Sequence, residues 1–199
     1  MSNRNQARRR SGIRFIVITA LILLPLAYLV YGIAWPFLTH QSDPGTASSA
    51  ADVAELTSVT PPPQASGFRV ASFDHGQARL VFVRFDAPAD VCEKYAAAVL
   101  PPNSKLKPLD WQDKYDDLST LYSGTLQFHD LSWFDLPYLQ SFWTSQGGKK
   151  VLRDPRGTDR IPEAPDVVGA EADTHLQGYA STKVRIDTSR GVFYFMRSN

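Results

Sequence analysis

Apolar residues form one uninterrupted run near the start of the chain and are interspersed with polar residues after it. Between Phe15 and Leu38 no residue carries a charge. At about 1.5 Å per residue, a helix over this run is roughly 36 Å long, enough to cross a hydrocarbon core of about 30 Å. The pattern therefore predicts a transmembrane helix over residues 15–38.

The same run is too long for a cleaved secretory signal. Such signals have shorter apolar stretches and end at a small-x-small cleavage site. The nearest candidate here is Gly32-Ile33-Ala34, and it is followed by the bulky pair Trp35-Pro36. We expect the helix to remain as an anchor.

Arginines indicate the orientation of this anchor. Residues 1–14 contain five arginines and no acidic residue, whereas the first Lys or Arg after the apolar run is Arg69. By the positive-inside rule, the N-terminus is predicted to be cytoplasmic and the C-terminal part extracytoplasmic. An aromatic ring at the far end of the run suits the headgroup level. The residues assigned to membrane topology are Arg8, Arg9, Arg10, Arg14 and Trp35.

The chain after the anchor divides into a polar stretch and a folded part. Residues 39–66 are rich in Ser, Ala, Thr, Asp and Pro, a composition that buries too little apolar surface to fold alone. They are predicted to form a flexible linker, although SSAADVAEL, with Ser49 as N-cap, has the signature of a short helix. Residues 67–199 fit one domain with one core.

Strand patterns occur throughout this domain. The run ARLVFVRFD, residues 78–86, is apolar on both faces, which favours a central strand. RVASF, residues 69–73, is its expected hairpin partner. The other predicted strands are residues 124–130, a hairpin around Gly147-Gly148, and a hairpin over residues 182–196 that ends in a buried aromatic strand.

Two segments have helical periodicity. The first covers residues 88–99 and stops before Pro101-Pro102. The second, residues 110–122, has an apolar face that we expect to be buried, made of Trp111, Tyr115, Leu118 and Tyr122. Strands and helices in this order predict an α+β domain in which one or two helices pack on one face of a mostly antiparallel sheet.

The charge distribution argues against nucleic acid as a partner. The net charge is +1, but five of the 21 basic residues lie in the first 14 positions, which leaves 16 basic against 20 acidic residues and a charge of −4 beyond them. A nucleic-acid-binding domain would need a basic face. The single cysteine, Cys92, excludes an internal disulfide and lies in the apolar register of a predicted helix, so we expect it to be buried.

Catalytic and metal-binding motifs are absent from the sequence. The four histidines are scattered, no pair has metal-ligand spacing, and HExxH, CxxC and GxSxG do not occur. His129 and Asp130 are adjacent, but neighbouring side chains on a strand point to opposite faces. We therefore predict no metal, no cofactor and no catalytic residue.

Two regions are candidates for binding. The first is dense in aromatic residues, and the adjacent Trp133 and Phe134 precede Pro137 in a predicted loop, where one of them is expected to be exposed. The second is the stretch 153–180, whose length indicates either a functional loop or an element without a clear pattern. The candidate binding residues are Trp133, Phe134, Tyr138, Lys149, Lys150, Arg153, Arg156 and Arg160.

These features predict a single-pass protein of the inner, cytoplasmic membrane of a bacterium. Its partners would be the lipid bilayer and an envelope protein or ligand, which the periplasmic or extracellular domain binds without catalysing a reaction. One alternative is an inhibitor or immunity-type protein that acts on an extracytoplasmic enzyme. Another is an envelope hydrolase or transferase that uses His129.

Overall fold

A computed structural model describes Pro25 and residues 48–75, 78–123, 126, 129–156, 160–172 and 181–198. The chain divides into two compact units, Met1–His40 and Gln41–Asn199, and the second contains all the elements discussed below. Apart from Pro25, the predicted membrane span lies outside the described residues, as do Arg8, Arg9, Arg10, Arg14 and Trp35. Among the helices that the structure does describe, none combines the length and apolar character needed to cross a bilayer.

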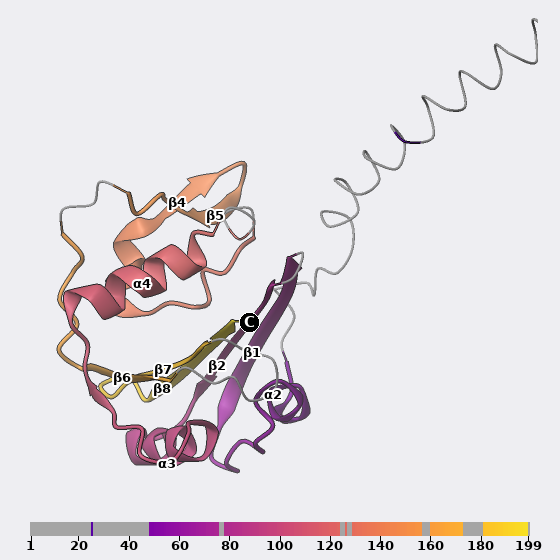
Figure 1. The fold of residues 1–199 in the computed structure, drawn as a ribbon, viewed down its shortest axis with the longest axis vertical. Helices are drawn as coiled ribbons and strands as arrows, with labels where there is room; N and C mark the ends of the chain where they lie inside the picture. The colour runs from indigo at the N-terminus through magenta and orange to yellow at the C-terminus, as the bar shows by residue number, and fades with distance from the viewer. Residues whose placement is uncertain are drawn as a thin grey trace, which may run out of the picture. The chain divides into compact units, whose positions relative to one another are not determined.

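The second unit is built on a six-stranded sheet in which every neighbouring pair is antiparallel (Figure 1). This confirms the predicted α+β class and the antiparallel sheet. The predicted central strand lies between two neighbours, and its hairpin partner is as expected. In spatial order the strands are β1 (Ser66–His75), β2 (Ala78–Asp86), β8 (Val192–Ser198), β7 (Ser181–Asp187), β6 (Val167–Ala172) and β3 (Lys107–Pro108).

Helices cover both faces of this sheet, not one face as predicted (Figure 1). Helices α2 (Ala50–Thr57) and α3 (Ala89–Val99) lie on one side. On the other side lie α4 (Trp111–Leu121), the 3-10 helix η2 (Pro137–Phe142) and the hairpin of β4 (Trp143–Gln146) and β5 (Lys149–Leu152). The hairpin turns at Gly147-Gly148, as predicted, with φ angles of 59° and 79° that favour glycine.

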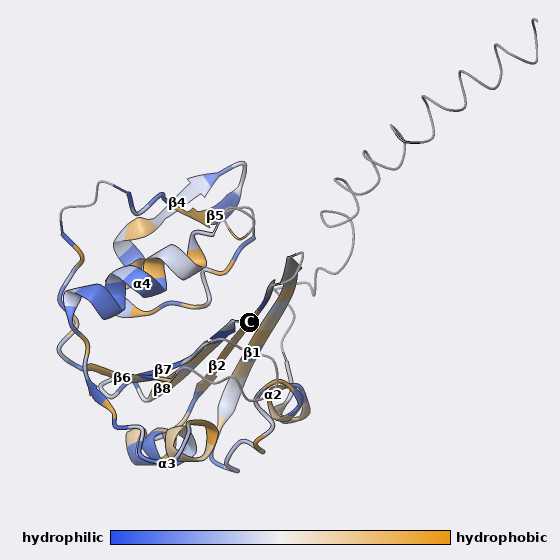
Figure 2. Ribbon diagram, in the orientation of Figure 1, coloured by the Kyte–Doolittle hydropathy of each residue, from blue (hydrophilic) through white to orange (hydrophobic). Residues whose placement is uncertain are grey.

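The core consists of two apolar clusters, one on each side of the sheet. Figure 2 shows hydrophobic positions on the strands of the sheet and on the helices α3 and α4 that flank it. Alternate residues of β8 contribute to opposite clusters: Tyr194 and Met196 to the side of α4, and Phe193 and Phe195 to the side of α3. Because both faces of β8 are covered, its first five residues, 192–196, are continuously apolar. The prediction that the aromatic strand near the C-terminus is buried is confirmed.

The stretch predicted as a linker, residues 39–66, contains part of the folded domain. Helix α2 begins with a capping box between Ser49 and Asp52, and its Val53 is fully buried in the core. The hydroxyl of Thr57, also buried, lies 2.8 Å from that of Tyr95 on α3. The linker prediction is wrong for residues 50–57. The average composition of the stretch does not show a short amphipathic helix, which docks on the domain by burying a single apolar residue.

Two further elements differ from the predictions. The stretch 153–180 contains strand β6, which pairs with β7 and β3, so this region hides an element without a clear pattern. Its sequence VVGAEA is too short and too rich in small residues to stand out as a strand. The strand predicted over residues 124–130 is absent at the described positions, where Leu126 lies in a 3-10 turn and His129 in a bend.

Candidate functional site

Helix α4 carries an aromatic stripe, Trp111 and Tyr115, that stays partly exposed although Tyr115 also packs against the core. Trp111 is 51% exposed, the only large hydrophobic side chain exposed to this degree among the described residues. Its ring stacks on that of Tyr115, with centroids 5.2 Å apart and planes at 13°. The two residues are one helical turn apart, and a capping box between Asp110 and Asp113 fixes the turn that bears Trp111. The result is a flat apolar surface.

The buried face predicted for α4 is only partly right: Leu118 lies in the core and Tyr115 and Tyr122 pack against it, but Trp111 is exposed. The residues that face the sheet are Lys114, Asp117, Leu118 and Leu121. Of the predicted face, only Leu118 is fully buried, while Tyr115 and Tyr122 are half-buried. Periodicity failed here because two buried positions are charged.

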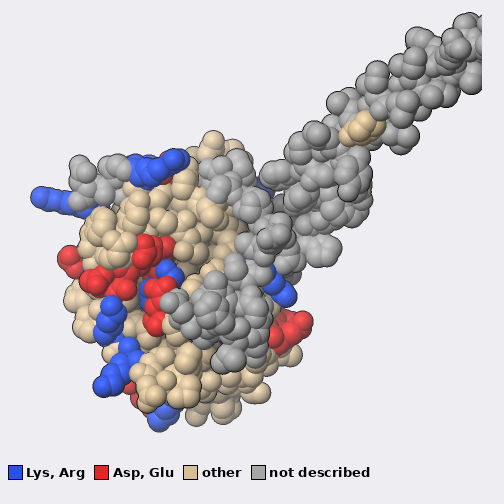
Figure 3. Space-filling model, viewed as in Figure 1, with Lys and Arg blue, Asp and Glu red and all other residues tan. Residues whose placement is uncertain are grey.

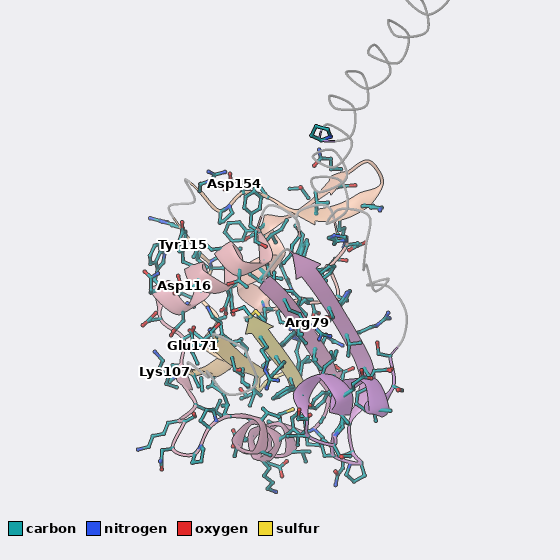
Figure 4. All side chains as sticks on the ribbon, turned by 45° about the vertical axis from the view of Figure 1, so that its right-hand side comes forward. Arg79, Lys107, Tyr115, Asp116, Asp154 and Glu171 are labelled. Atoms are coloured by element: carbon teal, nitrogen blue, oxygen red, sulfur yellow. The ribbon has the colours of Figure 1, made fainter. Side chains whose placement is uncertain are left out.

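A pocket continues this aromatic stripe toward the C-terminal end of α4. Its volume is about 400 Å³, within the range of about 300–1,000 Å³ typical of small-ligand sites. Helix α4 forms one wall and the segment after β5 forms the other; Figure 4 shows Tyr115 and Asp154 on the same side of the domain. The pocket is lined by Tyr115, Ser119, Tyr122, Ser123, Asp154, Pro155 and Arg156.

An ion pair and a tyrosine hydroxyl set the polarity of the pocket rim. Arg156 Nη2 lies 2.8 Å from Asp154 Oδ2, and Arg156 Nε donates to both carboxylate oxygens, at 3.1 and 2.9 Å. The Tyr122 hydroxyl also hydrogen-bonds with this pair. Hydrogen bonds from Arg156 hold the pKa of Asp154 below its usual value. The rim therefore presents donors and acceptors side by side, with no net charge.

Ser123 carries an unsatisfied hydroxyl beside the pocket. Its Oγ atom is buried and has no hydrogen-bond partner in the part of the chain that the structure describes. Buried polar atoms of folded proteins are nearly always paired, so such an atom calls for a water or ligand partner. Ser123 lines the pocket, but the Oγ atom itself is shielded from the open space, so the pocket does not by itself supply that partner.

A buried ionic cluster holds α4 against the sheet. Asp117 accepts hydrogen bonds from Arg185 Nε at 2.7 Å, from Arg185 Nη2 at 2.9 Å and from the Tyr138 hydroxyl at 2.6 Å. Lys183 Nζ lies 3.6 Å from both Asp117 and Glu171. Burial, together with the charge of Asp117, raises the pKa of Tyr138 well above its usual value, so the phenol remains a donor.

Strand β6 makes room for this cluster at Gly169. A Cβ atom there would lie 2.7 Å from Arg185 Cδ and 2.7 Å from Leu109 Cδ2, closer than such atoms can approach. The guanidinium of Arg185 also donates to the backbone carbonyl of Ala170, at 3.1 Å. The glycine thus permits an arginine to lie flat across the sheet beneath α4.

A second contact ties α4 to the chain before β6. Lys114 is almost fully buried and its Nζ lies 2.9 Å from Glu163 Oε2, a carboxylate that is exposed. Lys107 makes a further ion pair with Asp113, at 3.1 Å. Acidic side chains gather in one patch on the face shown in Figure 3, with basic side chains beside them. The helix is therefore fixed to the sheet at several points while its aromatic stripe stays accessible.

The aromatic platform predicted from the sequence is not at the surface. Phe134 and Tyr138 are fully buried; Phe134 packs edge-on against Phe82 and Tyr194, with centroids 5.5 and 5.1 Å away. Trp133 is half-buried and packs against the same cluster. The prediction of an exposed binding ring at these positions is wrong, because the loop before Pro137 folds over the sheet and buries its rings.

The basic residues predicted as a binding surface do not converge. Lys149 and Lys150 are exposed on the β4–β5 hairpin, and Arg160 is exposed in the stretch before β6. The guanidinium of Arg153 lies over the Phe142 ring, 5.7 Å from its centroid. Of these residues only Arg156 reaches the pocket.

His129 has the environment of a packed residue. Its ring lies 4.7 Å from that of Phe73, and burial, with the nearby charge of Lys149, lowers its pKa. The neighbouring Asp130 accepts hydrogen bonds from the backbone and hydroxyl of Ser132.

Cys92 is buried as predicted, and burial raises its pKa to about 11. Within the described residues no three His, Cys, Asp or Glu side chains converge as metal ligands.

The sequence did not predict the pocket, although it did predict the helix that forms one wall of the pocket. The signal was helix 110–122 itself, where the aromatic residues form one edge of the apolar face and Leu118 and Leu121 extend it toward Asp117. A helix that packs on the side of Asp117 leaves aromatic rings at the surface. Choosing that side required knowledge that Asp117 has a buried cationic partner.

Comparison with known proteins gives no relative from which to transfer a function. No family matches the chain, and no curated protein or solved structure is significantly similar to it. A function for this chain therefore has to be inferred from the site itself.

Proposed function

We propose that this chain is a membrane-anchored binding protein of the bacterial cell envelope. In this proposal residues 15–38 anchor it in the inner membrane with the N-terminus in the cytoplasm, and the α+β domain binds a ligand or partner outside the cytoplasm without catalysing a reaction. The charge asymmetry of the N-terminal segment supports the topology. The α4 pocket, defined by the seven lining residues given above, is the proposed binding site.

The observation that carries the proposal is the exposure of Trp111 stacked on Tyr115 at the edge of a formed pocket. An exposed tryptophan is costly in water and is a common anchor of binding surfaces. The scaffold beneath it is rigid, because Asp117 forms a buried ion pair with Arg185 and the buried Lys114 pairs with the exposed Glu163. Binding sites depend on such preorganised support.

A catalytic role for His129 has weaker support. A general base must lie within hydrogen-bond reach of its substrate and is usually oriented by a third group. His129 instead stacks on Phe73, and Asp130 is engaged by Ser132. Binding at the α4 pocket is therefore the better-supported function.

Site-specific photocrosslinking in intact cells tests this proposal. A benzophenone amino acid replaces Trp111 in the full chain, and the control places it at Lys94, which is also exposed but lies on α3 across the sheet. We expect an adduct from position 111 that position 94 does not give. Adducts of equal yield at both positions, or none at position 111, would contradict the proposed site.

A further inference from the structure

The α4 pocket combines a stacking surface with a dense set of hydrogen-bonding groups. We infer that its ligand is a neutral saccharide, an inference that rests on the proposed binding function and specifies its ligand class. Three features support a saccharide: the aromatic surface, the side chains that can hydrogen-bond with hydroxyl groups, and the net charge of the rim.

The aromatic surface suits the apolar face of a sugar ring. A pyranose presents several C–H groups on one side, and these pack on flat aromatic rings while the hydroxyls point outward. Tyr115 lines the pocket and its ring is stacked on that of Trp111 within 13° of parallel, so each ring offers only its outer, flat face. Tyr122 and Pro155 provide further flat surface inside the pocket.

The pocket lining suits a ligand with many hydroxyl groups. Six of its seven residues carry a hydrogen-bonding side chain, namely Tyr115, Ser119, Tyr122, Ser123, Asp154 and Arg156. Each hydroxyl of a saccharide both donates and accepts, so it pairs well with a carboxylate and a guanidinium placed side by side.

The rim charge argues for a neutral ligand. Arg156 and Asp154 neutralise each other at 2.8 Å, and the stripe on α4 begins beside the acidic Asp110 and Asp113. An anionic ligand would need an excess of positive charge, which this pair does not supply. A polyproline segment also binds aromatic-lined grooves, so a proline-rich peptide is the competing ligand that the titration has to exclude.

Calorimetric titration of the full chain tests the inference. The protein is placed in lipid nanodiscs, because alkyl maltoside detergents are themselves saccharides. The probes are the tetramers of N-acetylglucosamine, α-1,4-linked glucose and β-1,4-linked glucose. We expect at least one of them to bind with a Kd of about 1 mM or tighter, and the absence of binding heat for all three would overturn the inference.

Matched variants show whether binding occurs in the pocket. Trp111→Ala and Arg156→Ala should each weaken the Kd about tenfold or more, since aromatic and arginine side chains dominate binding energies. Gln112→Ala, which changes an exposed neighbour on the same helix, should leave the Kd unchanged. Thermal unfolding of each variant checks that the fold is retained. Equal Kd values for all three variants would place the saccharide elsewhere and overturn the inference.

A proline-rich decapeptide, titrated in parallel, separates the ligand class from the function. Binding of the peptide but of no saccharide, sensitive to Trp111→Ala, would overturn the saccharide and leave a binding pocket. A crosslinked adduct at position 111 without any saccharide binding would have the same meaning. Failure of both titrations together with failure of the crosslink would overturn the proposed function as well.

Discussion

At the scale of single residues, the position of α4 is decided by charges that lie in the interior. Lys114 and Asp117 read as surface residues in the sequence, yet both face the sheet. Their partners, Glu163 and Arg185, are 49 and 68 positions away in the chain. A helical pattern of apolar residues carries no information about such distant pairing, so the sequence could not show which face of the helix is buried.

The buried carboxylate of Asp117 should therefore be essential to stability. Asp117→Asn leaves Arg185 buried without its counter-charge, and removing one partner of a buried ion pair typically lowers the free energy of unfolding by about 3–5 kcal/mol. The matched control is Asp116→Asn, which removes the same charge one position earlier, outside the core, and should change stability by about 0.5 kcal/mol or less. Chemical denaturation measures both variants.

Similar unfolding free energies for these two variants would show that the charge at position 117 does not hold the helix. In that case the rigidity attributed to the scaffold of the pocket would have to come from its other contacts, the Lys114–Glu163 ion pair and the packing of Leu118 and Leu121.

At the scale of secondary-structure elements, sequence reasoning worked where the pattern was strong and local. The strands around residues 69–86 and 182–196 and the hairpin at Gly147-Gly148 are confirmed, because alternation, β-branched residues and turn glycines act over short distances. The order of the strands was not predictable, since β2 pairs with β8 over more than 100 residues. Short elements whose apolar residues are mostly small, such as α2 and β6, were missed or only weakly indicated because their patterns are short.

Helix α2 should contribute measurably to the stability of the domain. A chain that begins at Gly67 loses the burial of Val53 and the contact between Thr57 and Tyr95, which together should cost about 2–4 kcal/mol. The matched control is a chain that begins at Ser48 and keeps the helix. Urea unfolding should give the longer chain the higher midpoint, and equal midpoints would show that α2 is only a linker.

At the scale of the whole molecule, a predicted membrane anchor is joined to a domain whose proposed binding pocket lies between α4 and the segment after β5. The anchor remains a prediction from the arginine asymmetry and the uncharged run 15–38. The pocket was beyond sequence reasoning because it forms where α4 meets residues 154–156, more than 30 positions later in the chain. The central claim is that this pocket is occupied in the cell envelope.

Hydroxyl-radical footprinting tests that claim most directly. Oxidation of Trp111 and of Phe68 is compared between intact cells and the purified full chain in nanodiscs; Phe68 lies in the other apolar cluster and serves as the internal control. The account predicts that oxidation of Trp111 in cells falls by about threefold or more, because a ligand covers its ring, while Phe68 is unchanged. Equal oxidation of Trp111 in cells and in the purified protein would contradict the claim.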